Sequence, residues 1–358
     1  MPDLNREFRV AVDDLTRFMS KVLEASGADE PSTQAVTRAL VTASRMGTDS
    51  HGLRLLPHYV AALQGGRINP HPEMRFARRL AATGYLDADD GLGHLAGYAA
   101  IDHAIAMAGE VGIGAVAVGR SSHFGAAGCY SLAAAERGYI ALSVCNSDPF
   151  VLLHEGRQPF HGTNPLAFAA PVDGQVPYLL DMATSAIPWN RVQQYGAIGR
   201  GLPSEVAADA EGNVTCWPHD VSALLPLGGS AFGFKGAGLG GMVEILSSTL
   251  SGMLNGFRLL PMNGDDMATP RGVAHFFLVM KPDAFAERDS FQACMTAYLD
   301  DLRSQPALPG AEVLAPGDRE WRCQAQRDAH GIPLDSANQR AYAELAERFG
   351  IEPVKSVA

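Results

Sequence analysis

Apolar residues recur at helical spacing through the first part of the chain. In residues 8–27 they fall on one helical face, at Val10, Leu15, Phe18, Met19 and Leu23, and residues 31–46 repeat the pattern. A third apolar segment runs from Leu53 to Leu63 and is followed by Gly65-Gly66. The pattern predicts two helices over 8–27 and 31–46. It predicts a third over 53–63, with Asp49 or Ser50 as its cap.

The pattern changes near residue 74. Short apolar runs typical of buried strands alternate with helical segments over 98–109 and 126–137; the runs are 115–118, 140–145, 166–170, 178–180 and 275–280. Strands and helices mixed in this way predict an α/β or α+β core. Helical spacing returns over 283–304 and 336–349, so we expect the C-terminal part to pack on the N-terminal helices.

Composition and charge exclude several classes of protein. Hydrophobic residues make up 47% of the 358 residues, which is enough for a large core, and the net charge of −11 argues against binding to nucleic acid. The five cysteines are scattered without a CxxC pair, so neither a disulfide framework nor a zinc site is predicted. The N-terminal residues are charged and no apolar run is long enough to span a bilayer. We therefore expect a cytoplasmic protein that does not insert into a membrane.

Two histidines stand between small, flexible residues. His51 follows Asp49-Ser50, and His123 lies in Ser122-His123-Phe124-Gly125. Imidazole exchanges protons near neutral pH, so two such side chains suggest a pocket with acid–base chemistry. Most histidines are structural or solvated, and that assignment is given to His58, His154, His219 and His330. No metal-ligand trio and no G-x-S-x-G elbow accompany the pair, so metalloenzyme and serine hydrolase are poor interpretations.

Two further segments are open to more than one interpretation. Residues 236–241 match G-x-G-x-x-G, but the glycine-rich stretch before them cannot be a central strand, as a Rossmann fingerprint requires. We expect a glycine-rich loop that opens a helix over 239–253. Lys235 at its mouth could meet a phosphate, or the glycines could serve close helix packing. Residues 178–185 read as a strand running into either a nucleotide-holding turn or, as the residues alone favour, a plain helix cap.

Taken in order, the motifs of this chain resemble those of the malate/L-lactate dehydrogenase family, which is unrelated to the Rossmann-type lactate dehydrogenases. Its members include ureidoglycolate dehydrogenase, diketogulonate reductase, sulfolactate dehydrogenase and Δ1-piperideine-2-carboxylate reductase. Any one motif is commonplace, but the ordered set covers about residues 40 to 350. The motifs lie at 48–52, 122–125, 162–165, 180–185, 202–203, 209–212, 225–229, 235–236, 317–318 and 331–334.

The resemblance implies a fold and a reaction. It implies a non-Rossmann, mixed-sheet α/β domain that binds NADH or NADPH, over 74–299, with cofactor-binding parts around 123–196 and 225–245. It implies a helical domain over 1–73, completed by 300–358. The expected protein is a homodimer with its active site near the subunit contact. It would reduce a 2-oxo acid or cyclic imine, a small-molecule substrate, or catalyse the reverse oxidation.

The resemblance also carries residue roles. His51 and His123 would handle the proton, and Ser50, Arg54 and Tyr59 would lie at the substrate end; no metal is implied. The residues that would contact the cofactor are Ser147, Leu180, Asp181, Met182, Ala183, Thr184, Ser185, Phe234, Lys235, Gly317, Asp318 and Arg319.

This chain departs from the family pattern at the substrate anchor and two loops. Family members usually carry arginine four residues after the first histidine, where it can pair with a substrate carboxylate; here that position is Leu55. The usual Pro-x-Gly-Gly reads as residues 153–156, Leu-His-Glu-Gly, and the usual Ala-x-Gly-Lys reads as residues 188–191, Pro-Trp-Asn-Arg. One hypothesis is a reductase with a changed substrate. The alternative is a non-redox binding or scaffold protein.

Overall fold

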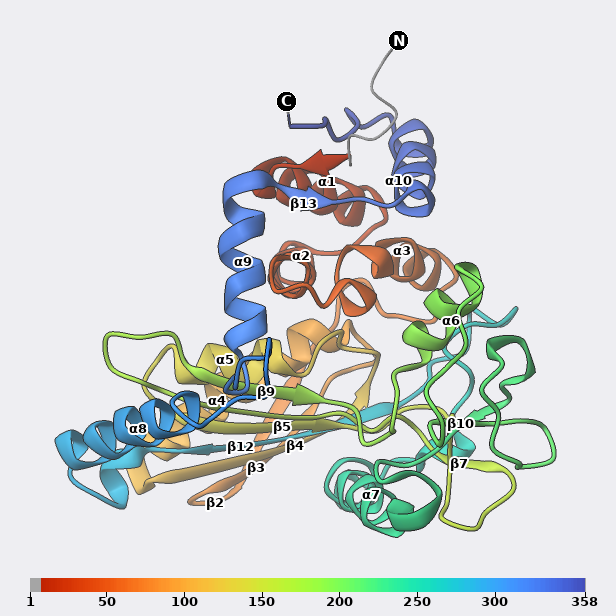
Figure 1. The fold of residues 1–358 in the computed structure, drawn as a ribbon. Coiled ribbons are helices and arrows are strands. Elements are labelled where there is room, and N and C mark those ends of the chain that lie inside the picture. Colours follow the sequence, from red (N-terminus) through yellow and green to blue (C-terminus); the bar gives the residue numbers. More distant parts are fainter. Residues whose placement is uncertain (1–7, 358) are drawn as a thin grey trace.

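The computed structural model describes residues 8–357 and arranges them in stacked layers (Figure 1). A helical layer lies above a seven-stranded sheet that carries helices on both faces, and a four-stranded sheet lies beside the larger one. Strands and helices are mixed along the chain, so the predicted mixed-sheet α/β fold is confirmed.

The helical layer is built from both ends of the described chain. It contains α1 (Val12–Ala25), α2 (Glu30–Arg45), α3 (Leu56–Gln64) and α10 (Ser336–Phe349). Strand β1 (Arg9–Val10) pairs antiparallel with β13 (Ile332–Pro333). The apolar faces of these helices meet in one core, in which Phe18 stacks on Tyr342 with ring centroids 5.1 Å apart. The carboxylate of Asp29 caps α2 by accepting from the N–H of Ser32.

The large sheet is mostly antiparallel, and only β3 and β4 run parallel. β12 is the central strand and is buried along most of its length, so its sequence VAHFFLVM is a continuous apolar run without alternation. In spatial order the strands are β2 (Arg75–Leu80), β3 (Thr83–Asp87), β4 (Ile113–Ser121), β12 (Val273–Met280), β5 (Ile140–Cys145), β8 (Leu166–Ala170) and β9 (Tyr178–Met182).

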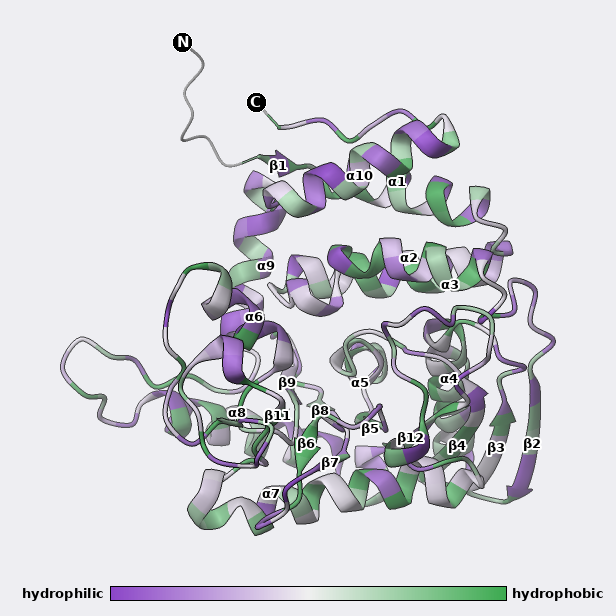
Figure 2. Ribbon diagram, turned by 90° about the vertical axis from the view of Figure 1, so that its right-hand side faces the viewer, coloured by the Kyte–Doolittle hydropathy of each residue, from purple (hydrophilic) through white to green (hydrophobic). Residues whose placement is uncertain are grey.

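Helices cover both faces of this sheet (Figures 1 and 2). Between the sheet and the helical layer lie α4 (Gly93–Val111) and α5 (Gly128–Ala135). Small residues let α4 approach closely, since a Cβ on Gly114 of β4 would lie 2.0 Å from the carbonyl oxygen of Ala104. On the opposite face lies α7 (Gly229–Glu244), which continues into a π-helical turn, Ile245–Thr249.

The remaining elements flank the large sheet. The small sheet contains β10 (Ala207–Ala208), β11 (Ala223–Leu224), β6 (Val151–Leu152) and β7 (Pro159–His161), and α6 (Trp189–Ala197) packs against it. α8 (Arg288–Arg303) lies along the edge of the large sheet near β9. α9 (Asp318–His330) connects this edge to the helical layer (Figure 1). Short 3₁₀ turns span Asp49–His51, Leu53–Leu55, Pro218–Asp220, Gly256–Arg258 and Pro282–Ala284.

The structure corrects several predicted elements. The first helix begins at Val12 because residues before it pair with β13. The third begins only at Leu56, after two 3₁₀ turns, and neither Asp49 nor Ser50 caps it. The glycines of 236–241 lie inside α7, not in a loop ahead of a helix over 239–253.

Within the described part of the chain, no helix has both the length and the apolar character needed to cross a bilayer.

Candidate active site

A cavity of about 310 Å³ lies where the helical layer meets the carboxyl-terminal ends of several strands. Its wall is formed by the connection from α2 to α3, the segment before α5, the segment after β5, the end of β9, the start of α6 and Glu320 of α9. The loop residues Met262 and Asn263 complete it. The helical layer, the large sheet with its connections and α6 therefore contribute to one cavity.

The two predicted histidines meet in this cavity. The rings of His51 and His123 stack with centroids 5.8 Å apart and planes 22° apart. His51 comes from the helical layer and His123 from the segment that follows β4. Burial lowers the pKa of both rings, and for His123 the neighbouring His51, His58, His94 and the Arg271 guanidinium lower the pKa further. Both imidazoles are therefore favoured in the neutral form.

The turn that carries His51 is held by the C-terminal part of the chain. Arg327 of α9 binds both carboxylate oxygens of Asp49, and its Nη1 also donates to the carbonyl oxygen of Ser44 at the end of α2. Behind the turn, a Cβ on Gly52 would lie 2.3 Å from Oγ of Ser44, so only glycine fits there. This clamp fixes the backbone on which His51 stands.

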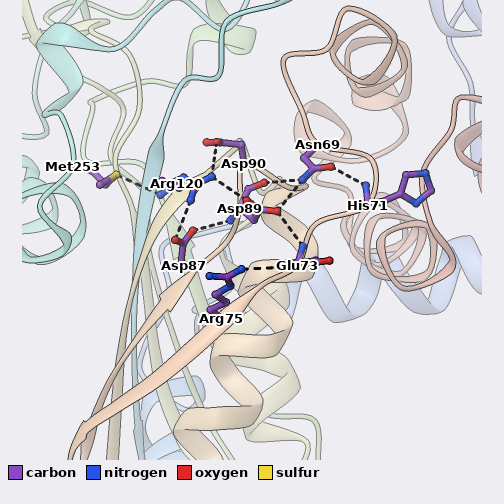
Figure 3. Close-up of polar contacts among 9 residues, drawn as sticks. All are labelled: Asn69, His71, Glu73, Arg75, Asp87, Asp89, Asp90, Arg120 and Met253. Atoms are coloured by element: carbon purple, nitrogen blue, oxygen red, sulfur yellow. Dashed lines mark hydrogen bonds and ion pairs between the residues drawn. The ribbon is translucent and has the colours of Figure 1, made fainter.

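The strand end that carries His123 is held by a charged cluster (Figure 3). Arg120 donates to Asp87 and Asp89 at 3.0 Å each and to Asp90 at 3.1 Å. The N–H of Asp90 donates back to the carbonyl oxygen of Arg120 at 2.8 Å. Asp89, Asp90 and Arg120 all have positive φ values, between 51° and 54°. Side chains rarely adopt this conformation, so the ion pairs hold a backbone shape that propensity disfavours.

The same cluster reaches the helical layer. The amide of Asn69, five residues beyond the end of α3, donates to Oδ2 of Asp89 at 2.9 Å, and its N–H donates to the carbonyl oxygen of Asp90. Figure 3 shows Asn69 and Arg120 on opposite sides of these two aspartates. The loop after α3 is thus joined to the loop between β3 and α4, which is bonded to the end of β4 three residues before His123.

A buried glutamate organises the segment after β5. Glu244 of α7 is 7% exposed and accepts hydrogen bonds from the amides of Asn146 and Asn164, from the Ser248 hydroxyl and from the N–H of Gly256. Asn164 in turn accepts from the N–H of Ser147, whose hydroxyl accepts from the N–H of Thr163. The cavity residues Ser147 and Thr163 are therefore positioned from α7.

A buried ion pair fixes the loop that contributes Met262 and Asn263. Arg271 binds Asp148 with both side chains under 10% exposed, and Asp148 also accepts from the N–H of Met262 at 3.0 Å. Arg67 donates to the carbonyl oxygens of Pro261, Met262 and Asp266. A buried pair with further hydrogen bonds is costly to break, so this loop is held rigidly at the cavity.

Some of the expected site residues line the cavity. Ser50, His51 and His123 lie in its wall, as do Ser147, Asp181, Met182 and Ala183. Asp181 is exposed to the cavity and accepts from the N–H of Gly128 at 2.9 Å, and partial desolvation by the surrounding wall raises the pKa of its carboxyl group to about 6. Leu55 lines the cavity at the position where the family pattern has arginine, whereas Arg54 is exposed elsewhere.

Other expected residues lie outside the cavity wall. Tyr59 is fully buried behind His123, and Leu180 points away from the cavity side of β9. Thr184 and Ser185 bond to the carbonyl oxygens of Thr163 and Ile187. Phe234 and Lys235 are exposed on α7, and of the segment 317–320 only Glu320 reaches the cavity, since Asp318 pairs with Arg303.

Sequence reasoning missed the supporting residues Arg120, Glu244 and Arg327. Glu244 carried a weak signal, because a lone carboxylate in the apolar run Met242–Leu246 needs buried partners. The partners of Arg120 and Arg327 follow from the tertiary fold, and no spacing in the chain predicts them.

Comparison with known proteins agrees with this architecture. Residues 10–341 match the family model described as malate/L-lactate dehydrogenase. The chain is 36% identical to malate dehydrogenase of Pyrococcus horikoshii, with 96% of each chain covered. It is 31% identical to ureidoglycolate dehydrogenase (NAD(+)) of Escherichia coli, over 91% of this chain and 92% of the relative. The structure of Δ1-piperideine-2-carboxylate reductase from Pseudomonas syringae superimposes with a TM-score of 0.83 at 31% identity, over 94% and 99% of the two chains.

Proposed function

The chain belongs to the malate/L-lactate dehydrogenase family, and from that premise we propose that it reduces a C=O or C=N bond next to a carboxyl or carbonyl group, or oxidises the corresponding product, with a nicotinamide cofactor. The observation that carries the proposal is the pair of imidazoles, 5.8 Å apart, that open on one cavity. Such a reaction requires protein groups that hold and release one proton beside the reacting oxygen or nitrogen.

The residues of the cavity fit a nicotinamide dinucleotide. Gly125, Ala126 and Ala127 leave a wall of small side chains and accessible backbone, against which a flat ring can lie. The hydroxyls of Ser147 and Thr163 and the amide of Asn190 offer donors and acceptors for a carboxamide and sugar hydroxyls. When bound, the cofactor supplies or accepts the hydride, and the protein supplies orientation and the proton.

The chain's own residues then prepare the substrate. Ser50 is bonded to Nδ1 of His51 at 2.9 Å and orients that ring in the cavity. A substrate oxygen between the two imidazoles receives hydrogen bonds as negative charge develops on it, which lowers the barrier. The helical layer covers one side of the cavity and limits the access of bulk water to it.

The substrate end of the cavity supports a changed specificity. Leu55, Phe150 and Met262 supply apolar surface to the wall, and the Asp148 carboxylate there is already paired with Arg271. A free carboxylate held by arginine is the expected arrangement for simple 2-oxo acids. We propose that the preferred substrate is bulkier at this end or presents its carboxyl group in another orientation.

Turnover assays test the reaction directly. A panel of 2-oxo acids and cyclic imines, followed by the absorbance of NADH and of NADPH, should give turnover with at least one pair. His51→Asn and His123→Asn should each lower kcat by about 10²–10⁴ while changing cofactor affinity little. Wild-type protein that binds neither reduced cofactor in calorimetry would contradict the proposal and favour a non-redox scaffold.

We also propose that the protein is a homodimer that joins through α7. An apolar face follows this helix and the segment after it, and Figure 2 shows α7 at the outer surface opposite the helical layer. The exposed side chains are Phe232, Phe234, Leu239, Met242, Ile245, Leu250, Leu254 and Phe257. An exposed apolar patch of this extent marks an interaction surface. The expected cofactor contacts Phe234 and Lys235 would then lie at the subunit contact.

Light scattering tests the assembly. Wild-type protein should run as a dimer, and Ile245→Asp should give a folded monomer because it places a charge in the apolar face. Leu308→Asp, an exposed leucine away from this face, serves as the control and should remain dimeric. A monomeric wild type would contradict this part of the proposal.

A further inference from the structure

Two hydrogen-bond donors converge on one nitrogen of His123. The Tyr59 hydroxyl lies 2.7 Å from Nδ1, and the N–H of Gly125 is directed at the same atom at 3.3 Å. A backbone N–H can only donate, so Nδ1 must present its lone pair. The single proton of the neutral ring therefore resides on Nε2, and Tyr59 is a donor.

Nε2 of His123 opens on the cavity. Tyr59 is fully buried on the Nδ1 side, between the His123 ring and the edge-on ring of His94, whose centroid is 4.7 Å away. Within residues 8–357, Nε2 of His123 meets no polar partner and is not enclosed by protein. The ring thus directs an N–H, and not a lone pair, at whatever occupies the cavity.

His51 is held in a different way. Its Nδ1 lies 2.9 Å from the Ser50 hydroxyl, which can donate or accept. The ring keeps that hydrogen bond in either neutral tautomer and when doubly protonated. Among the described residues no backbone N–H is directed at the His51 ring, so its hydrogen bonds do not fix one protonation state; burial lowers its pKa, but no charged neighbour lowers it further as happens at His123.

Most of the charged and titratable groups around His123 disfavour a second proton on its ring, and the one carboxylate among them, Asp148, is paired with Arg271. Besides His51, they are His58 and Tyr59 on α3, His94 on α4, and Arg271 with its partner Asp148. Arg271 is positive and buried, and it repels an additional proton on His123. Burial and these neighbours lower the pKa of His123 well below its ordinary value, so the ring stays neutral at physiological pH.

We propose that the two histidines divide the work: His123 stays neutral and donates a hydrogen bond through Nε2–H to the reacting oxygen or nitrogen, whereas His51 transfers the proton. Tyr59 and Gly125 are positioning residues that fix the tautomer of His123. This inference rests on the proposed function for the identity of the reaction.

The proton step balances on His51. In reduction of a carbonyl, the carbon receives a hydride, and the electron pair of the C=O π bond moves to oxygen. The N–H bond of doubly protonated His51 breaks, its electron pair stays on nitrogen, and the proton forms the O–H bond of the product. His51 is left neutral and is reprotonated from water. His123 keeps its proton throughout and stabilises the oxygen while it is negative.

Nitrogen NMR of ¹⁵N-histidine-labelled, unliganded protein tests the assignment without substrate. His123, assigned by the loss of its signals in His123→Asn, should show an unprotonated Nδ1 and a protonated Nε2, unchanged from pH 8 to pH 6. His51 should be the member of the pair whose signals shift first as the pH falls. A protonated Nδ1 on His123, or His123 titrating before His51, would overturn the proposal.

Tyr59→Phe tests the positioning role, and Tyr342→Phe is its matched control. Tyr342 is also fully buried, and its hydroxyl donates to the carbonyl oxygen of Leu53 at 2.9 Å. Loss of the Tyr59 hydroxyl leaves only the longer hydrogen bond from Gly125, at 3.3 Å, so the His123 signals should move toward a mixture of tautomers. We expect kcat to fall at least about tenfold with little change in KM. The control should change neither quantity. An unaltered His123 spectrum and unaltered kcat in Tyr59→Phe would refute the role of Tyr59.

Different results would overturn the division of work between the histidines and the proposed function. Turnover by wild-type protein together with the wrong tautomer overturns the division of work and leaves the proposed function standing. The expected tautomer without turnover of any 2-oxo acid or imine overturns the proposed function.

Discussion

Arg327 and Asp49 form a bidentate ion pair that joins α9 to the turn that carries His51. Nη2 of Arg327 lies 2.9 Å from Oδ2 of Asp49, and Nη1 binds Oδ1. The Arg327 side chain is 11% exposed and the Asp49 side chain 41%, so solvent screens this pair from the Asp49 side only. The position of one imidazole therefore depends on a helix 278 residues away in sequence.

Arg327→Gln should lower kcat strongly and change the thermal midpoint of unfolding little. The turn at 49–51 would lose both carboxylate contacts, and we expect kcat to fall at least about tenfold because His51 is no longer held at its working position. Arg322→Gln, on the same helix but paired with exposed Glu312, is the control. Steady-state kinetics and the thermal midpoint measure the two effects. Equal kcat for the two variants would show that the ion pair between Arg327 and Asp49 does not position His51.

Glu244→Gln should destabilise the protein and weaken cofactor binding together. The substituted amide cannot accept from all four donors that now converge on Glu244, and we expect a loss of about 2–3 kcal/mol in the free energy of unfolding. Urea denaturation measures the loss, with exposed Glu347→Gln as control. Because Asn164 positions Ser147, calorimetry should also show weaker NADH binding. A change of less than about 0.5 kcal/mol, which is the scatter of surface substitutions, would contradict the organising role of Glu244.

Buried histidines should make the fold sensitive to acid. Burial lowers the pKa of His94 and of His275 to about 3 and that of His58 to about 4. A group with a lowered folded-state pKa contributes stability that is present above its unfolded pKa of about 6.5 and is lost as the pH falls. Each such histidine should cost about 1.4 kcal/mol per pH unit between about pH 6 and its own folded-state value.

His94→Leu isolates one of these contributions. Neither ring nitrogen of His94 has a polar partner among the described residues, so an apolar side chain should be tolerated at pH 8. Urea midpoints measured from pH 8 to pH 5 should fall less steeply in this variant than in wild type. His330→Leu, at an exposed position, should retain the wild-type slope. Parallel curves for His94→Leu and wild type would refute the assignment.

The cavity should prefer NADH to NADPH. The described cavity wall contains three carboxylates, Asp148, Asp181 and Glu320, and no lysine or arginine. Of the three, Asp148 is paired with Arg271. The extra phosphate of NADPH would be repelled by the other two, and we expect about tenfold tighter binding of NADH at low salt. Because the pKa of Asp181 is raised to about 6, the preference should narrow below that pH, as the carboxyl group becomes neutral.

Asp181→Asn combined with Glu320→Gln should reduce this preference at pH 8. Glu312→Gln, near the start of α9 but paired with Arg322 at the surface, controls for net charge. Dissociation constants for both reduced cofactors can be obtained by fluorescence titration. A preference that survives in the double variant would show that other groups set it.

Leu55→Arg should restore activity toward simple 2-oxo acids. Leu55 lines the cavity near His51, and a guanidinium there could pair with a carboxylate through two hydrogen bonds. We expect KM for a small 2-oxo acid to fall by about tenfold or more, without a gain for the corresponding amide. Leu55→Met keeps the size without the charge and should give no gain. Equal effects on acid and amide would contradict an electrostatic anchor.

Much of the fold could be predicted where local pattern and tertiary environment agree. The strand over 140–145 and the helix over 336–349 have the predicted bounds. The proximity of His51 and His123 was expected from the family motifs that carry them, and the structure brings the two rings together.

Prediction failed where tertiary contacts override local preference. Glycine is a poor helix former, so the segment 236–241 reads as a loop. In α7 a Cβ on Gly236 would lie 2.3 Å from the carbonyl oxygen of Leu227, and the glycine is there for that close approach. The left-handed backbone of Asp89 and Arg120 likewise depends on ion pairs between separate loops, which no local pattern encodes.

The placement of Arg327 on α9 has a consequence for synthesis of the protein. The segments of the large sheet have all been synthesised by residue 280, yet the residue that secures the first histidine is made 47 positions later. The strands of the sheet are thus all synthesised before the residue that completes the support of the reactive centre exists.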